Sequence, residues 1–315
     1  MPGKKVTLRS LGAELGVAPA TVLRALNNHP SVTMDLRRRI VELAQRRHYA
    51  LPVHYKKRVA VVIPGFSFEG YTGIILSSLG RELDFNGFET EILSVSNLEA
   101  LHDQFYAGVI STVWTAGLEK RWPQEHSVPL VALNAMSNFR EGIYRVTSDE
   151  KQGIMEGMER LYRAGRRRIA FVSTPLDSNI NAEKRVEVFH DFCRSRRISE
   201  SSFHEEMHVG YELEAIAESI IGKKADAVFA ACESFAPKLL FLFSRRGIRV
   251  PDDLSLLALE NPAITPYTIP PLTALTQDFH ELARQCVRLL SDQINRKTGV
   301  REILVPYRFI ERESI

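Results

Sequence analysis

Long apolar runs, a secretory signal and paired cysteines are all missing from this 315-residue chain. No run of about 18 apolar residues occurs, so the sequence predicts no membrane-spanning segment. The first ten residues, MPGKKVTLRS, lack the apolar stretch of a secretory signal. The only cysteines, Cys193, Cys232 and Cys286, lie far apart without metal-ligand spacing. We therefore expect buried reduced thiols, no metal site and a cytoplasmic location.

The signatures of common enzyme classes are also missing. The chain contains no GxSxG, HExxH or P-loop pattern. Its nine histidines are scattered, and His190 and His280 are more simply surface or capping residues on helices. We expect no catalytic residues and no cofactor, and a sensor enzyme is the less favoured alternative.

The charge of the chain is unevenly divided, although its overall composition, 44% hydrophobic and 25% charged, is that of an ordinary globular protein. Residues 1–58 hold twelve lysines and arginines against three acids, a net charge of +9, whereas the remainder carries −6. A small basic segment joined to an acidic body is typical of a nucleic-acid-binding domain attached to a sensor. A basic segment alone is more often a solvated surface. Whether this one binds nucleic acid therefore depends on the fold that is predicted for it.

The stretch from Val6 to Asn27, VTLRSLGAELGVAPATVLRALN, predicts two short helices joined by a tight turn. Thr7 can cap the first helix through its hydroxyl. Gly16 can adopt the left-handed conformation that ends a helix, and Pro19 suits the first position of the second helix. Such pairs also occur as packing units, but this geometry lets a helix enter the major groove of DNA.

A third helix, expected over residues 34–47 with Thr33 as its N-cap, favours the DNA-binding interpretation. One face of this helix is apolar, with Leu36, Ile40, Leu43 and Ala44. Its other faces carry arginines at positions 37, 38, 39, 46 and 47, so the basic segment coincides with the helix–turn–helix.

The stretch GVAPATVLRALNNHPSVTMDLRRRIVELAQRRHY resembles the DNA-binding headpiece of the lactose-repressor/galactose-repressor (LacI/GalR) family of transcription regulators. The family pattern is roughly VTxxDVAxxAGVSxxTVSRxLNxxxxVxxxTRxRVxxAxxxLxY. The resemblance implies that residues 19–24 face the bases. The candidate DNA-binding residues are Thr7, Ala18, Pro19, Ala20, Thr21, Arg24, Asn27, Lys56 and Lys57. Two serines of the pattern are Ala18 and Leu23 here, and each lost hydroxyl removes one phosphate donor.

Residues 50–58, ALPVHYKKR, form a short linker. Members of the family usually carry a hinge helix here, of the type NxxARxL, which inserts a leucine into the minor groove. Only nine residues separate Tyr49 from the first strand at Val59, and Pro52 interrupts them. We expect no hinge helix. Lys56 and Lys57 either solubilise the tether or, as we favour, contact the phosphate backbone.

From Val59 onward, short apolar runs alternate with helical stretches. RVAVVIPG, GVISTVW, VPLVALN, RRIAFVS, AVFAACE and DLSLLALE are too short for helices and favour buried parallel strands. FETEILSV and the closing REILVPYRFI are also expected to be strands. Helices are expected over residues 73–85, 98–106, 150–164, 182–196, 212–221, 235–246 and 279–297. This alternation, in two series, predicts two doubly wound lobes with a cleft between them.

The resemblance to the LacI/GalR family extends into this region. VTSDEKQGIMEGMERLYRAGRRRIAFVS is similar to the family's VxxDNxxGxxxAxxxLxxxGHRRIAFI, and PPLTALTQDFHELARQCVRLL to PPLTTVxQPxxxLGxxAVxLL. It implies an all-α helix–turn–helix headpiece (1–49), the linker (50–58) and a periplasmic-binding-protein-like α/β core (59–315) that forms a homodimer. The first lobe would hold about 59–145 and 275–300, and the second about 146–274 and 301–315.

The resemblance also implies an effector site between the lobes. An arginine in the family pattern RxxGF grips the effector, and Arg185 has that place in NAEKRVEVF. A planar guanidinium suits paired hydroxyls or a carboxylate, so we expect a carbohydrate-like effector, a sugar or sugar derivative. The other candidates lie just after strands or at the starts of helices: Phe68, Tyr71, Trp114, Cys232, Glu233, Glu260, Asn261 and Gln277. For the three aromatic residues, a place in the hydrophobic core is an equally good explanation. We expect removal of Arg185 to abolish the effector response and to leave the fold intact.

Three functions therefore compete. The favoured one is an effector-controlled regulator, a repressor of the LacI/GalR type, that binds a palindromic operator in double-stranded DNA as a dimer. The second is a solute-binding protein, which the missing signal and the basic headpiece argue against. The third is a regulator whose core has lost small-molecule binding and only dimerises or binds a protein partner.

Overall fold

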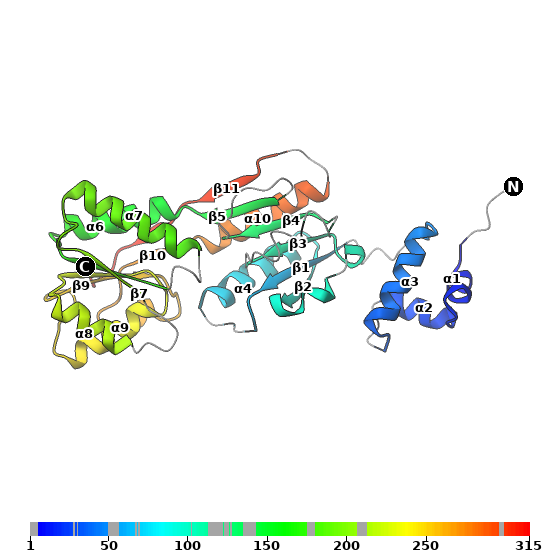
Figure 1. Cartoon of the computed structure of the whole chain (residues 1–315), viewed down its shortest axis with the longest axis horizontal. Helices are drawn as coiled ribbons and strands as arrows, with labels where there is room; N and C mark the ends of the chain where they lie inside the picture. The colour runs from blue at the N-terminus through cyan, green and yellow to red at the C-terminus, as the bar shows by residue number, and fades with distance from the viewer. Residues whose placement is uncertain are drawn as a thin grey trace.

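A three-helix headpiece is followed by two α/β lobes in the computed structural model of the chain (Figure 1). The structure describes residues 6–27, 29, 31–49, 57–66, 68, 70–101, 103–112, 122, 126, 128–134, 143–174, 180–206, 213–295 and 299–315. The expected architecture of an all-α headpiece and a two-lobed α/β core is confirmed. Within the described residues, no helix is both long and apolar enough to cross a membrane.

The first two helices, α1 (Leu8–Leu15) and α2 (Pro19–Leu26), form as local signals predict. The Thr7 hydroxyl accepts a hydrogen bond from the Ser10 backbone N–H at 3.2 Å, and the Ser10 hydroxyl accepts one from the Thr7 N–H at 2.9 Å. This reciprocal cap satisfies two N–H groups that the first helical turn leaves unpaired. Gly16 follows α1 with a φ of 69°, and Pro19 takes the first position of α2. The predicted cap, turn and helix start are confirmed.

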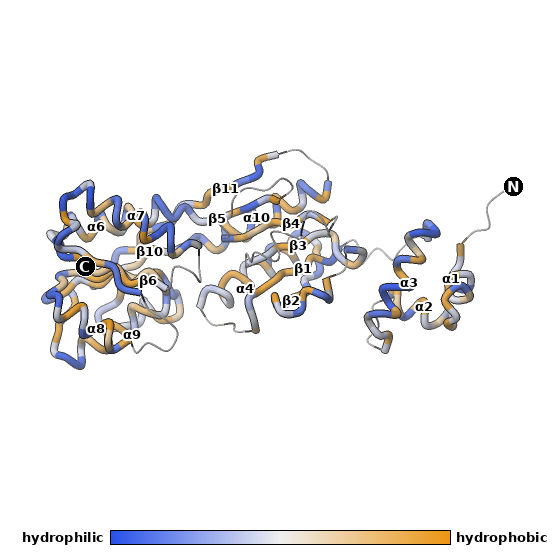
Figure 2. Tube along the Cα trace, viewed as in Figure 1, coloured by the Kyte–Doolittle hydropathy of each residue, from blue (hydrophilic) through white to orange (hydrophobic). Residues whose placement is uncertain are grey.

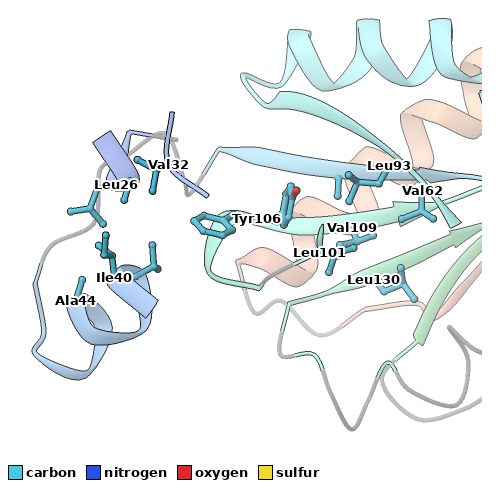
Figure 3. Packing of buried hydrophobic residues seen from close by; sticks show 14 of the residues in the cluster. Leu26, Val32, Ile40, Ala44, Val62, Leu93, Leu101, Tyr106, Val109 and Leu130 are labelled. Atoms are coloured by element: carbon cyan, nitrogen blue, oxygen red, sulfur yellow. The ribbon is translucent and has the colours of Figure 1, made fainter. Parts of the chain in front are cut away.

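The third helix, α3 (Met34–Arg46), closes the headpiece over a small apolar core. Figure 3 shows Leu26, Val32, Ile40 and Ala44 gathered in this core, and all four are buried. Gly12 lets α1 approach the turn closely, because a Cβ there would lie 2.5 Å from the carbonyl oxygen of Val17. The apolar faces of the helices point inward, so their polar and basic faces are left outward.

The first lobe is built on a parallel sheet with strand order β11-β5-β4-β3-β1-β2. Its strands are β1 (Arg58–Ile63), β2 (Glu89–Ser94), β3 (Gly108–Ser111), β4 (Leu130–Leu133), β5 (Ile143–Ser148) and β11 (Glu302–Val305). Helices α4 (Gly70–Phe85) and α10 (Phe279–Ile294) cover one face. Figure 2 shows hydrophobic residues along β1, β3 and β4, as burial on both faces of a parallel sheet requires.

The second lobe has strand order β12-β10-β9-β8-β6-β7, and only β12, which pairs with β10, is antiparallel. Its strands are β6 (Ile169–Ser173), β7 (Phe203–Glu206), β8 (Ala227–Ala230), β9 (Ser255–Leu259), β10 (Ala274–Thr276) and β12 (Arg308–Ile310). Helices α6 (Glu150–Arg163) and α7 (Ile180–Arg196) pack on one face, and α8 (Leu213–Gly222) and α9 (Phe235–Arg245) on the other.

The chain crosses between the two sheets three times, and the third crossing corrects the predicted lobe boundaries. The stretch REILVPYRFI is not one strand: β11 pairs with β5 in the first lobe, and β12 pairs with β10 in the second. Pro306, which has no N–H for a ladder, separates the two strands. This crossing therefore lies at residues 306–307 rather than near 300. The other two lie between β5 and α6 and between β10 and α10.

Two further predictions about secondary structure were wrong. The helix expected over residues 98–106 is instead two 3₁₀ segments, η2 (Val95–Ala100) and η3 (Asp103–Phe105), and Leu101 between them is extended. Strands β5, β7 and β10 were not predicted. Polar residues interrupt the apolar ones in β5, β7 is a partly buried edge strand with a polar sequence, and β10 has three residues, so none shows a hydrophobic run.

Gly157 lets α6 pack closely on the second sheet. A Cβ at Gly157 would lie 2.8 Å from Leu257 and 2.9 Å from Leu275 and Phe229. Gly157→Ala should therefore lower the free energy of unfolding by about 1–3 kcal/mol through overpacking. Gly80→Ala, inside α4 with no atom within 4 Å, should raise it by about 1 kcal/mol through helix propensity. Urea denaturation of both variants tests this, and equal shifts in the same direction would contradict the packing account.

Candidate functional site

The outer face of α2 carries the residues expected to contact DNA. Ala18, Pro19, Ala20 and Arg24 are exposed and Thr21 is half-buried. The inner face of the same helix is buried, with Val22, Ala25 and Leu26 against α1 and α3. Small side chains at the N-terminal end allow a close approach to base edges, and Arg24 projects from the last turn. Thr7 and Asn27, also expected at DNA, are exposed at the start of α1 and at the C-cap of α2.

The arginines of the headpiece have different roles. Arg37 is buried and donates hydrogen bonds to the carbonyl oxygens of His29 at 2.7 Å and Val32 at 3.1 Å, so it holds the loop between α2 and α3. Arg47 pairs with Glu14 at 2.9 Å. Arg24 and Arg39 are exposed and form no ion pair with any residue that the structure describes. Both guanidinium groups are thus available to an external anion.

Of the two linker lysines expected at DNA, the structure describes only one. Lys57 is exposed immediately before β1. Lys56 and the rest of residues 50–56 lie outside the described residues, as does Trp114, so the predicted absence of a hinge helix stays a prediction.

Arg185, the expected effector anchor, lies between the lobes but is paired with an acid of its own chain. Its Nε donates to Oε2 of Glu150 at 2.7 Å and its Nη2 to Oε1 at 2.9 Å, and both side chains are buried. A third donor, Nη1, contacts the carbonyl oxygen of Ala231 at 3.1 Å. Burial alone would lower the pKa of Arg185, but the Glu150 carboxylate more than offsets this and raises the pKa well above the ordinary value of an arginine side chain. The guanidinium therefore stays charged within a neutral pair.

A chain of hydrogen bonds leads from this pair into the first lobe. The Tyr307 hydroxyl lies 3.0 Å from Oε2 of Glu150 and accepts from Nε2 of Gln277 at 3.0 Å. Asn134 donates to Oε1 of Gln277 at 2.9 Å and to the Tyr71 hydroxyl at 2.8 Å. Burial raises the pKa of both tyrosines, so their hydroxyls stay protonated. Gln277 and Tyr71, two of the expected effector residues, thus belong to this network.

Two other contacts join the lobes directly. Oε1 of Glu233 accepts from the Tyr71 backbone N–H at 3.2 Å, at the N-terminus of α4, where N–H groups lack partners within the helix. Gly70 permits this approach, because its φ is +55° and a Cβ would lie 2.7 Å from the Glu233 oxygen. In the second contact, the Asn181 side chain donates to the carbonyl oxygen of Asn134 at 2.9 Å.

Glu260 lines the same small cavity as Tyr71 and Gln277, and Asn261 and Phe68 line the groove beside it. Glu260 forms a bidentate ion pair with Arg312, at 2.7 and 3.0 Å, and Asn261 accepts from the Ala263 N–H at 3.1 Å. Both therefore order the second lobe. Cys232 is half-buried, with its sulfur 3.6 Å from Glu233, whereas Cys193 and Cys286 are buried as expected. Phe68 is exposed and packs edge-on against Phe66.

Little space remains between these side chains. A cavity of about 20 Å³, lined by Tyr71, Gln277, Phe279 and Tyr307 among others, holds about one water molecule. A wider groove of about 900 Å³ opens beside it, between one face of α4 and the second-lobe segments at 233–238 and 261–264. The small cavity has no room for a ligand larger than a water molecule. Among the described residues, no cluster of three metal-ligating side chains occurs.

The sequence did not single out Glu150, Asn134, Asn181 or Tyr307. One signal was present: Glu150 stands where the pattern VxxDNxxG has asparagine, so a charge had been introduced at this position. The buried pair with Glu150 argues against the expectation that Arg185 can be removed without harm to the fold. Loss of the arginine leaves a buried carboxylate without its counter-ion, which costs about 3–5 kcal/mol.

Comparison with known proteins identifies the class. A family model described as a periplasmic binding protein-like domain matches residues 158–315, half of the chain. With its helix–turn–helix headpiece, the chain belongs to the LacI/GalR family of transcription regulators, whose core is this domain.

Relatives match along their whole length. Catabolite control protein A of Priestia megaterium is 26% identical, over 98% of this chain and 99% of its own. The ribose operon repressor of Halalkalibacterium halodurans is 24% identical, over 98% and 96%. Among solved structures, the lac repressor dimer bound to operator and the anti-inducer ONPF superposes with a TM-score of 0.72 at 20% identity, over 99% of both chains. A CelR–cellobiose complex gives 0.72 at 22%, over 98% and 100%.

Glu233→Gln should loosen the start of α4. The substitution keeps the shape of the side chain but removes the charge that faces the helix N-terminus. The free energy of local opening at the start of α4 should therefore fall by about 1 kcal/mol. The Tyr71 amide should then exchange with solvent roughly fivefold faster, because about 1 kcal/mol corresponds to that factor. Hydrogen exchange of the Tyr71 amide is the measurement.

Glu218→Gln is the matched control, since Glu218 pairs with Arg246 on the exposed side of the second lobe. An unchanged exchange rate at Tyr71 in Glu233→Gln would show that this contact does not hold the lobes together.

Proposed function

We propose that the chain is a sequence-specific transcription regulator that binds a palindromic operator as a homodimer. Its affinity for DNA would be modulated by a small carbohydrate-like molecule between the lobes. The main support is that one chain combines a helix–turn–helix with an exposed Arg24 and a two-lobed core whose polar groups converge on the cleft. We also propose that it acts in the cytoplasm, where its DNA ligand lies, and that it has no enzyme activity.

The exposed face of α2 supports major-groove recognition. Alanine and proline at positions 18–20 leave room for the DNA backbone, and Arg24 presents a planar fork that suits the O6 and N7 acceptors of guanine. The +9 charge of residues 1–58 supplies the phosphate contacts on which affinity depends. The domain division, with residues 1–49 as the DNA-binding unit, 50–58 as linker and the remainder as sensor, is part of this proposal.

Apolar residues on the surface support the homodimer. Tyr267, Ile269 and Phe241 of the second lobe are exposed by 79%, 93% and 60%. Contiguous exposed apolar residues, rather than single ones, mark association surfaces, so Tyr267 and Ile269, two positions apart, are the main candidates. We propose a second copy of this chain as the partner, because two headpieces are needed for a palindromic operator.

The polar groups between the lobes support an uncharged effector. Arg185 already has a counter-ion, whereas Gln277, Asn134 and Tyr71 offer amide and hydroxyl groups, with Phe279 beside them. Such a mixture of ring faces and neutral hydrogen-bonding groups suits a sugar. The names of the relatives, among them a ribose operon repressor and a regulator solved with cellobiose, agree with this class.

A core without effector binding is the second candidate. It is favoured by the 20 Å³ cavity and by the direct hydrogen bonds that fill the cleft. A thermal-shift screen of neutral sugars separates the two candidates, since a ligand at a hundred times its Kd adds about 2.7 kcal/mol to the free energy of unfolding.

Arg24→Ala should weaken binding to an operator enriched from genomic DNA by roughly 1–3 kcal/mol, the value of one arginine–guanine pair. Arg47→Ala is the matched control, because Arg47 is engaged by Glu14. Fluorescence anisotropy across salt concentrations is the measurement, and wild-type affinity should fall steeply as salt rises. Equal losses in both variants would refute the assignment of α2, and a flat salt dependence would refute DNA binding itself.

The short linker should restrict the spacing of operator half-sites. Without a hinge helix, no side chain is wedged between central base steps, so these base pairs should contribute little to affinity. A panel of operators with altered centres and spacers, together with a DNA-bending assay, tests this. Strong dependence on one central step, with a sharp bend, would mean that a linker residue replaces the hinge.

A further inference from the structure

The Glu150 carboxylate holds Arg185 in the way that an anionic ligand would. Its two oxygens face Nε and Nη2 of the guanidinium at 2.7 and 2.9 Å, which is the paired geometry in which arginine binds carboxylates. The pair is sealed from solvent, with Glu150 3% and Arg185 7% exposed. The Tyr307 hydroxyl and the Ala231 carbonyl occupy the neighbouring positions around it.

The pair lies where the three crossings between the lobes meet. Glu150 opens α6, directly after the first crossing, and its negative charge is favoured at the N-terminus of that helix. Gln277 belongs to the second crossing and Tyr307 to the third, and both join the same hydrogen-bond network. A group that binds Arg185 therefore affects all three connections at once.

We propose that Glu150 is a built-in counter-ion that takes the place of a ligand's anionic group on Arg185 and so excludes anionic effectors from the cleft. The inference rests on the proposed function and adds a rule of specificity to it. A sugar acid or sugar phosphate that approached Arg185 would have to share the guanidinium with a second buried negative charge. A neutral sugar meets no such repulsion and can use Gln277, Asn134 and Tyr71.

The test is chemical rescue of the full-length protein with acetate. Glu150→Ala removes the carboxylate and leaves a buried guanidinium beside space that acetate can fill. Acetate should raise the melting temperature of Glu150→Ala in a saturable manner and bind it at least tenfold more tightly than the wild type. Chloride at the same ionic strength should not substitute for it. Glu156→Ala, on the same helix but bonded to Gln152, is the matched control and should show no rescue.

A second set of variants covers the case in which Glu150→Ala does not fold. Glu150→Gln keeps the side-chain shape and should gain affinity for glucuronate over glucose by at least tenfold relative to wild type. Adding Arg185→Met to Glu150→Gln removes the buried charge, and the gain should disappear. Wild-type protein that binds glucuronate as tightly as glucose, or a Glu150→Gln variant that gains no affinity for glucuronate, would overturn the proposal.

Binding to an operator distinguishes failure of the proposed function from failure of the counter-ion proposal. If wild-type protein enriches no DNA sequence, the proposed function fails whatever the anions do. If it binds an operator but the Glu150 variants show neither rescue nor altered specificity, only the counter-ion proposal fails.

Discussion

The buried ion pair between Glu150 and Arg185 anchors the hydrogen-bond network that links the three connections between the lobes. Moving two opposite charges out of water is costly, and the attraction between them offsets that cost only when the remaining donors and acceptors are satisfied. Here Tyr307 and the Ala231 carbonyl complete the set. Because Glu150, Gln277 and Tyr307 come from three different crossings, satisfying one buried pair also fixes the path of all three connections.

The headpiece is stabilised by apolar packing and local capping rather than by a buried ion pair. Its three helices pack on apolar side chains, and its caps and glycine turn are local, so none of these contacts involves the polar network between the lobes. Most of its arginines face outward, while Arg37 is buried and ties a loop. This division of roles lets the outer charges be used for DNA without loss of folding stability.

Features set by neighbouring residues could be predicted from the sequence, and features set by distant ones could not. Thr7, Gly16 and Pro19 act on their own helices, and apolar runs such as RVAVVIPG identify buried strands. Arg185 was found through a family pattern, but its partner Glu150 is 35 positions away and was not found. The edge strand β7 and the break at Pro306 also depend on which sheet each segment joins, which local periodicity does not reveal.

The paired state of Arg185 changes how substitutions in the cleft have to be interpreted. When one partner of a buried ion pair is removed, the measured loss of about 3–5 kcal/mol reports the charge left behind rather than a lost ligand contact. A variant of Arg185 that no longer responds to an effector would therefore be ambiguous, because weakened lobes give the same result. Replacing both partners with neutral groups of similar volume avoids this, since such exchanges are often neutral for stability. Only in that background does a change in ligand response describe the site itself.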